Sequence, residues 1–196
     1  MKLIGTIQQV QIQRERLKKG ERPNRYYDPT PILVVDALKL TQRGVFGLLA
    51  DGGTLIDLHH MDHPQTRNRN NANGISFNFV GNYHKIQARF GDHIQPGVGG
   101  ENIIIQQTPE FDLSMLDTKL LIQPQGTNQY ITLEDVMVAA PCREFSCFVY
   151  GEVIDGDNLR NTLEYLSDGT RGFYATLSIK QSDTPIIQAG DKVYIE

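Results

Sequence analysis

Short runs of aliphatic and β-branched residues recur along the chain, and turn residues separate them. They lie at 3–12, 32–40, 54–59, 75–79, 103–106, 119–122, 136–139, 145–149, 174–179 and 193–195. Runs of about four to eight such residues between Gly, Pro, Asn or Asp are typical of strands. Many short strands with frequent turns favour a barrel or a sandwich, so we predict a mainly β protein.

The first run carries a finer signal. Leu3, Gly5 and Ile7 alternate with polar residues, and Val10 and Ile12 continue the alternation after a shift of one position. A shift of phase inside a half-buried strand predicts a β-bulge. Helical spacing of apolar residues is found at 82–90 and 158–166, and a glycine follows each segment. We therefore expect a few short helices beside the strands.

Length and charge limit the classes of function. A chain of 196 residues with 39% hydrophobic and 21% charged residues is typical of one globular domain, which we expect to cover residues 1–196. The net charge of −4 gives no overall attraction to nucleic acid or to anionic lipid. No apolar run approaches the roughly 18 residues of a membrane span. We therefore expect a cytoplasmic protein with no nucleic-acid or membrane partner.

The two cysteines differ in their sequence context. Cys142 follows Pro141 and precedes Arg143, whereas Cys147 lies inside the apolar run 145–149. Proline cannot donate to a sheet, which places the first thiol at a strand end or a bulge. An adjacent cation lowers the pKa of a thiol and so favours the reactive thiolate. We predict that Cys142 is reactive and that Cys147 is a buried strand residue. The alternative is that Cys142 is an unreactive, half-buried thiol.

A polar segment at 57–69 combines ligands for metals with ligands for anions. It contains the side chains His59, His60, His63, Arg67 and Arg69. Adjacent strand residues point to opposite faces, so only one of His59 and His60 can readily join His63 around a zinc ion. The arginines could bind a phosphate or a carboxylate in fork geometry. A polar surface loop without a ligand is the alternative.

Three further segments are candidates for binding an anion. The loop 97–102 contains Gly99, Gly100, Glu101 and Asn102, and the N–H groups of glycine-rich loops can hold an oxyanion. This loop matches neither a P-loop nor a dinucleotide fingerprint, and a tight turn is the alternative. Arg171 lies between two glycines in the turn 168–174, where it could face a pocket.

The third segment, 14–25, holds six arginines and lysines, a glycine and a proline. We predict an exposed hairpin loop there, with binding of an anionic partner as the alternative.

Four blocks, taken in order, resemble the MOSC domain family, named for the C-terminal domain of molybdenum cofactor sulfurase. They are Gly-Gly-Glu-Asn-Ile at 99–103, Pro-Cys-Arg-Glu-Phe at 141–145, Gly-Thr-Arg-Gly-Phe-Tyr at 169–174 and Gly-Asp-Lys-Val at 190–193. The resemblance covers nearly the whole chain from Gly5 onward. It implies a stand-alone, single-domain member with the barrel-like MOSC fold, which is similar to the β-barrel of pyruvate kinase.

The resemblance also implies a chemistry. Cys142 matches the signature cysteine of the family, which accepts and donates sulfur as a persulfide or binds molybdenum through its thiolate. Relatives that reduce N-hydroxylated compounds use a pterin-based molybdenum cofactor, whose phosphate needs cationic groups. The predicted cofactor-binding residues are Arg67, Arg69, Gly99, Gly100, Glu101, Asn102, Arg143 and Arg171. The implied partners are an anionic small molecule or cofactor and a sulfur donor or redox partner.

Two other functions are compatible with the sequence. A metal-dependent hydrolase would use the cluster from His59 to His63, with His60 and His63 as ligands. A non-catalytic module would bind an anion or a partner protein without any chemistry at the thiol.

Overall fold

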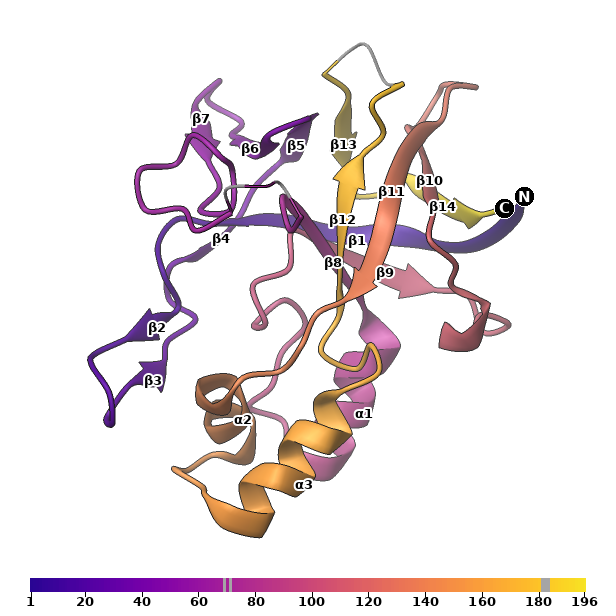
Figure 1. The fold of residues 1–196 in the computed structure, drawn as a ribbon. Coiled ribbons are helices and arrows are strands. Elements are labelled where there is room, and N and C mark those ends of the chain that lie inside the picture. Colours follow the sequence, from indigo (N-terminus) through magenta and orange to yellow (C-terminus); the bar gives the residue numbers. More distant parts are fainter. Residues whose placement is uncertain (69, 71, 181–183) are drawn as a thin grey trace.

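A computed structural model describes residues 1–68, 70, 72–180 and 184–196 of the chain. Seven of the described strands close into a barrel, which confirms the predicted fold class (Figure 1). They are β1 (Lys2–Gln13), β8 (Ile75–Phe79), β9 (Ile103–Gln107), β10 (Leu120–Gln123), β11 (Ile131–Val138), β12 (Phe173–Leu177) and β14 (Lys192–Ile195). Their order around the barrel is β14-β10-β11-β12-β8-β9-β1, and pairing of β14 with β1 closes the ring.

The long strand β1 takes part in three pairings. It pairs with β14 near its start, with β9 in its middle and with β4 (Ile32–Val34) at its end. The register between β1 and β9 shifts between Ile7 and Gln9. This is the position at which the hydrophobic alternation changes phase, so the predicted bulge is confirmed. Bulges bend a strand and increase its twist, which suits a strand that must follow a closed barrel.

The strands β8 and β9 are parallel, and α1 (Val80–Phe90) lies between them in the sequence. Parallel neighbours need a crossover connection, which this helix supplies. It corresponds to the helix predicted at 82–90. The second predicted helix is confirmed as α3 (Gly156–Leu166).

Two smaller sheets flank the barrel. One has the order β13-β5-β6-β7, from β13 (Ile186–Gln188), β5 (Ala37–Thr41), β6 (Gly44–Leu48) and β7 (Thr54–Ile56). The strand predicted at 32–40 is therefore divided, because its first half pairs with β1 and its second half pairs with β6. The other sheet is the hairpin of β2 (Lys18–Lys19) and β3 (Tyr26–Tyr27), at the predicted hairpin loop.

The strand predicted at 145–149 is wrong. This segment belongs to a helix, α2 (Arg143–Tyr150), which begins after Cys142 and ends at Gly151 with a left-handed φ of 90°. Phe145 and Val149 lie four positions apart, so both face the protein interior from the same side of the helix. An apolar run of this length fits a strand or a short helix equally well, and periodicity alone does not separate them.

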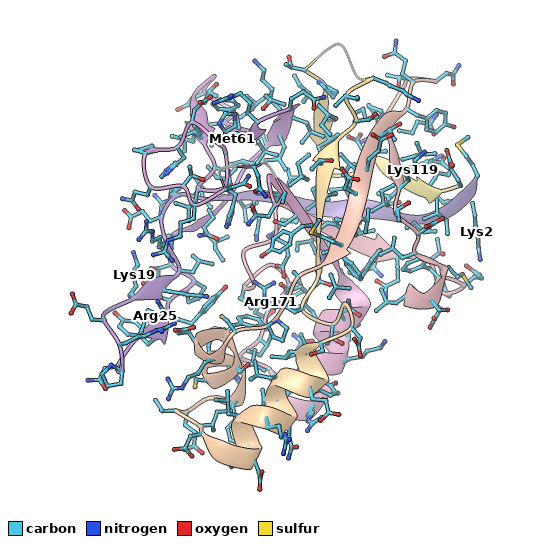
Figure 2. The ribbon with its side chains drawn as sticks, in the orientation of Figure 1. Lys2, Lys19, Arg25, Met61, Lys119 and Arg171 are labelled. Carbon is cyan, nitrogen blue, oxygen red and sulfur yellow. The ribbon has the colours of Figure 1, made fainter. Side chains whose placement is uncertain are left out.

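The three α-helices lie together beside one end of the barrel (Figure 1). Two groups of buried side chains correspond to these two layers: one fills the barrel, and the other packs α1, α2 and α3 together with the hairpin. Arg171 lies between the layers (Figure 2). A short 3₁₀ helix at Leu113–Met115 completes the described elements. None of the helices in the described part of the chain has the length and apolar character needed to cross a membrane.

The centre of the barrel is aromatic, and this allows a first test. Phe77 is fully buried, with its ring 5.2 Å from the ring of Phe173 and 6.0 Å from that of Phe79. We predict that Phe77→Ala lowers the free energy of unfolding by about 3–5 kcal/mol, because it leaves a cavity among rings that cannot close around it. Urea unfolding measures the effect. The control is Val34→Ala at an exposed strand position, and equal effects of the two changes would contradict the assignment of the core.

Candidate functional site

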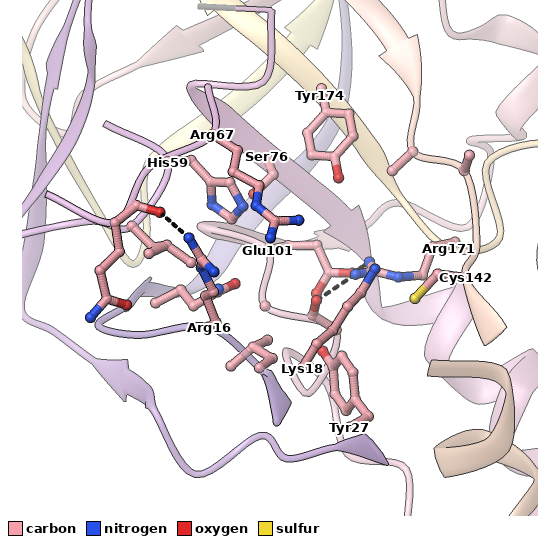
Figure 3. A pocket seen from close by; sticks show the side chains of 18 of the residues that line it. Arg16, Lys18, Tyr27, His59, Arg67, Ser76, Glu101, Cys142, Arg171 and Tyr174 are labelled. Atoms are coloured by element: carbon pink, nitrogen blue, oxygen red, sulfur yellow. Dashed lines mark hydrogen bonds and ion pairs between the residues drawn. The ribbon is translucent and has the colours of Figure 1, made fainter. Parts of the chain in front are cut away.

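A cavity of about 360 Å³ opens between the barrel, the helix layer and the β2–β3 hairpin (Figure 3). Its wall includes the predicted site residues Arg67, Gly99, Gly100, Glu101, Cys142 and Arg171. We call it the Cys142 cavity. The structure thus brings together residues from four segments that are far apart in the sequence. Arg69 lies outside the described residues.

An ion pair between Arg171 and Glu101 forms the floor of this cavity. Nη1 of Arg171 lies 2.6 Å from Oε1 of Glu101, and Nη2 donates to the carbonyl of Gly99 at 2.5 Å. The guanidinium carbon lies 4.4 Å from the centre of the Phe145 ring. Burial alone would lower the pKa of Arg171, but the Glu101 carboxylate outweighs it and raises the pKa. Arg171 is therefore a permanent cation inside the protein.

The second oxygen of Glu101 is also occupied. Oε2 accepts a hydrogen bond of 2.5 Å from the hydroxyl of Tyr83, which in turn accepts one of 3.1 Å from the N–H of Gly99. Tyr83 is fully buried on α1, and burial together with the Glu101 charge raises its pKa far above the usual value. The Tyr83 hydroxyl therefore stays protonated and donates a hydrogen bond to the Glu101 carboxylate. The sequence contained no local signal for this contact.

Gly99 and Gly100 make close contacts within the protein. A Cβ at position 99 would lie 2.3 Å from Oε1 of Glu101 and 2.8 Å from Nη1 of Arg171. The N–H of Gly99 donates to Tyr83, and the N–H of Gly100 donates to the carbonyl of Gly97 at 2.9 Å. Neither N–H is available to an oxyanion, so the predicted cradle of backbone N–H groups is wrong at these positions. Gly99 is needed so that the ion pair can lie against the loop.

Asn102 lies beneath the cavity and does not line it. Its Oδ1 accepts hydrogen bonds of 3.0 Å from the N–H and the hydroxyl of Ser76, and its Nδ2 donates to Asp57 at 3.2 Å. The amide of Asn102 therefore bonds within the protein, and a cofactor in this cavity would have to be held by other side chains. The side chain instead joins the start of β8 to the segment that carries His59.

Cys142 is half-buried and lines the cavity, as predicted for the reactive cysteine. Its neighbour Arg143 does not line this cavity but contributes to a second one, of about 330 Å³, on another side of α2. Cys142 is the extended N-cap residue of α2 and Arg143 is its first helical residue, so the chain changes direction between the two side chains. The predicted joint action of Arg143 and Cys142 on one ligand is therefore not supported. Cys147 is half-buried and lines the second cavity, so its predicted place in a buried strand is wrong.

The hairpin contributes cations that the sequence indicated only as a basic surface run. Arg16, Lys18 and Arg25 line the Cys142 cavity together with Arg67. In the described part of the chain, Arg16 and Arg67 have no carboxylate partner, and Arg16 donates a hydrogen bond of 3.2 Å to the carbonyl of Gln65. Nζ of Lys18 lies 3.8 Å from Oε2 of Glu144.

The hairpin is attached to α2 by a partly buried ion pair. Nε and Nη2 of Arg25 each lie 2.5 Å from Oε1 of Glu144, and the hydroxyl of Tyr27 donates to the carbonyl of Val98 at 2.8 Å. Burial opposes ionisation of Glu144, but its own backbone N–H and Arg25 outweigh burial and lower the pKa of this carboxyl. Glu144 therefore neutralises Arg25 and holds the hairpin as one wall of the cavity.

The strand predicted at 54–59 ends at Ile56, so His59 and His60 lie in the turn that follows it and not in a strand. The two side chains still separate, and the predicted metal site is not formed. His59 lines the Cys142 cavity, whereas His60 is buried with its ring 4.5 Å from that of Phe46. The Nδ1 atoms of His60 and His63 accept the N–H groups of residues two positions further along the chain, each at 3.1 Å. Within the described ranges, no group of three or more His, Cys, Asp or Glu residues could hold a metal ion.

Comparisons with known proteins support the fold alone. No protein-family model matches the sequence, and no curated protein matches it. The chain is similar to the crystal structure of the YuaD protein from Bacillus subtilis, with 13% identity, a TM-score of 0.58 and coverage of 97% of this chain and 94% of that one. A second crystal structure, of a hypothetical protein, has 10% identity and a TM-score of 0.52 over 84% of this chain and 63% of that one. This chain and the two solved structures share the fold.

The floor of the cavity can be tested by removing one charge. We predict that Glu101→Gln lowers the free energy of unfolding by about 3–5 kcal/mol, because Arg171 remains buried without its counter-charge. Urea unfolding measures the loss, and Glu110→Gln at an exposed position is the control. A loss no larger than that of the control would show that the ion pair is dispensable.

The attachment of the hairpin predicts a dependence on pH. Because the pKa of Glu144 is lower in the folded chain, its stabilising effect is present above about pH 4.5 and is lost as the pH falls through the folded value. Wild type should therefore be more stable than Glu144→Gln near neutral pH, and the difference should disappear in acid. Unfolding in urea across this range measures the difference. A gap that stays constant with pH would contradict the ionic attachment.

Proposed function

We propose that this chain is a MOSC-type protein that handles molybdenum cofactor or sulfur at Cys142. The observation that carries the proposal is that a half-buried thiol shares one cavity with cations that lack carboxylate partners among the described residues. The thiol and Arg171 come from two of the blocks that resemble the family. The similarity to the two solved structures supports the barrel fold and carries no information about the chemistry.

The charges around the cavity favour an anionic ligand. Glu101 neutralises Arg171, and Glu144 neutralises Arg25. Arg16 and Arg67 then remain as net positive charge at the cavity, in a chain whose total charge is −4. Arginine binds phosphate through two parallel hydrogen bonds, which are stronger than neutral ones. A phosphate or a sulfur-containing anion is therefore the favoured class of ligand.

The residues present fit a pterin-based molybdenum cofactor. Cavities of about 300–1,000 Å³ are usual for small-molecule sites, and this one has about 360 Å³. Cys142 would hold the metal through its sulfur, which suits a soft donor, and Arg16 and Arg67 would hold the phosphate. The bound cofactor would supply redox chemistry at molybdenum, such as reduction of an N-hydroxylated compound.

The same residues also fit a sulfur carrier. A persulfide on Cys142 is an anion near neutral pH, and the cations of the cavity would stabilise it. Such a protein needs a sulfur donor, and the molybdenum form needs a redox partner. A cytoplasmic location, where thiols stay reduced, belongs to the same proposal. The alternative of a histidine-dependent hydrolase is not supported, because its predicted metal ligands His60 and His63 do not line the cavity.

Elemental analysis and intact-mass spectrometry of the purified protein test this proposal. We expect bound molybdenum, or an added mass of about 32 Da for one sulfur atom, in the wild type and in Cys147→Ser. We expect neither in Cys142→Ser. Cys147 is the matched control, because it is a half-buried thiol on the helix that begins directly after Cys142 and it lines the other cavity. Equal loading of both variants, or zinc in place of molybdenum and sulfur, would contradict the proposal.

Protection from alkylation tests the anion site separately. We predict that inorganic phosphate slows the reaction of iodoacetamide with Cys142 and leaves Cys147 unaffected, because the anion would occupy only the first cavity. Replacing Arg16 and Arg67 together by alanine should abolish the protection. Arg160→Ala, at an exposed position on α3, is the control. Protection that survives the double replacement would place the anion elsewhere.

A further inference from the structure

The backbone of His59 is held from both sides. Its N–H donates to Oδ1 of Asp57 at 2.8 Å, and its carbonyl accepts a hydrogen bond of 2.7 Å from Nδ2 of Asn68. The half-buried ring lines the Cys142 cavity (Figure 3). A side chain that is fixed in this way can act on a ligand with little loss of conformational freedom.

Asp57 holds the ring as well as the backbone. It is fully buried, and its Oδ1 lies 3.3 Å from Nδ1 of His59. Its Oδ2 accepts hydrogen bonds from the N–H of Gln13 at 2.7 Å and from Asn102 at 3.2 Å. A fixed carboxylate beside Nδ1 favours the tautomer that carries its proton on that nitrogen. The other nitrogen, Nε2, is then the one that can take up or release a proton.

Nε2 of His59 is available to a ligand. It makes no hydrogen bond within the part of the chain that the structure describes, whereas Nε2 of the neighbouring His60 lies 3.3 Å from the hydroxyl of Thr41. The charged groups that share the cavity with His59 are Arg16, Lys18, Arg25, Arg67, Glu101 and Arg171. Figure 3 shows His59 on one side of this cavity and Cys142 on the other, so a bound ligand would lie between them.

We propose that His59 is the proton-transfer residue of the Cys142 cavity and that Asp57 is its positioning residue. This inference rests on the proposed function in its sulfur-carrier form. The ligand class is a small hydropersulfide, R–S–SH, which binds between the thiol and the imidazole.

The proposed step needs no external oxidant or reductant. The Cys142 thiol gives its proton to solvent, and the thiolate attacks the terminal sulfur of the donor. A bond forms between the Cys142 sulfur and that sulfur, and the S–S bond of the donor breaks. The leaving thiolate takes a proton from Nε2 of His59, and His59 takes one back from solvent. The products are the Cys142 persulfide and R–SH, and His59 returns to its starting state.

Loading of Cys142 by glutathione persulfide tests the inference, with the gain of one sulfur followed by intact mass. We expect His59→Ala to slow loading roughly 100-fold, the lower range for removal of an acid–base group. Added imidazole should restore part of the rate, because it can occupy the space of the missing ring. Alkylation of Cys142 by iodoacetamide should be unchanged, because it depends on the thiolate fraction and not on a proton for a leaving group. His84→Gln, exposed on α1, is the control and should load normally.

The role of Asp57 is tested by combining variants. Asp57→Asn should slow loading in the wild-type background and have no further effect in the His59→Ala background, because a positioning residue acts through the ring. Slowing in both backgrounds would mean that Asp57 only maintains the fold. A His59→Ala protein that loads at the wild-type rate would overturn the inference and leave the proposed function intact. A wild type that takes up no sulfur would overturn the inference together with the sulfur-carrier form of the function.

Discussion

The buried ion pair between Arg171 and Glu101 joins the parts of the protein that surround the cavity. Glu101 precedes β9, Arg171 follows α3, and Tyr83 reaches the same carboxylate from α1. Because both charges are enclosed, each depends on the other, and loss of either would leave an uncompensated charge inside the protein. The Gly99 carbonyl and the Phe145 ring occupy the rest of the guanidinium surface. The relative positions of barrel and helices therefore depend on this contact.

The fold could be predicted where its cause is local. The change of phase after Ile7 identified the bulge, and the spacing of apolar residues identified α1 and α3, because side-chain periodicity follows backbone geometry directly. The failure at α2 has an equally physical reason: one and a half turns of helix and a short strand both bury an apolar run. The strands β6 and β13 were missed because their residues give no clear alternation, and only their partners define them.

The candidate site could be predicted only in part, because a cavity is a long-range property. Cys142, Arg67 and Arg171 were identified as chemical groups from their neighbours in the sequence, and the structure places them in one cavity. The N–H groups of Gly99 and Gly100 and the amide of Asn102 bond within the protein, and sequence does not show which backbone and amide groups the protein itself will occupy. The pairing of His59 with Asp57 could have been noticed, since the two residues lie two positions apart and a short turn brings them together.

The β2–β3 hairpin carries side chains that would select a ligand, whereas the reactive thiol lies on another part of the cavity wall. The hairpin supplies Lys18 and Arg25, and Arg16 lies directly before it, whereas the thiol and the ion pair of Arg171 with Glu101 belong to the helix layer and the barrel. Its two strands pair with each other and with no barrel strand in the described part of the chain. Substitutions at Lys18 and at the nearby Arg16 can therefore alter the accepted ligand through their charge while the reactive centre stays in place.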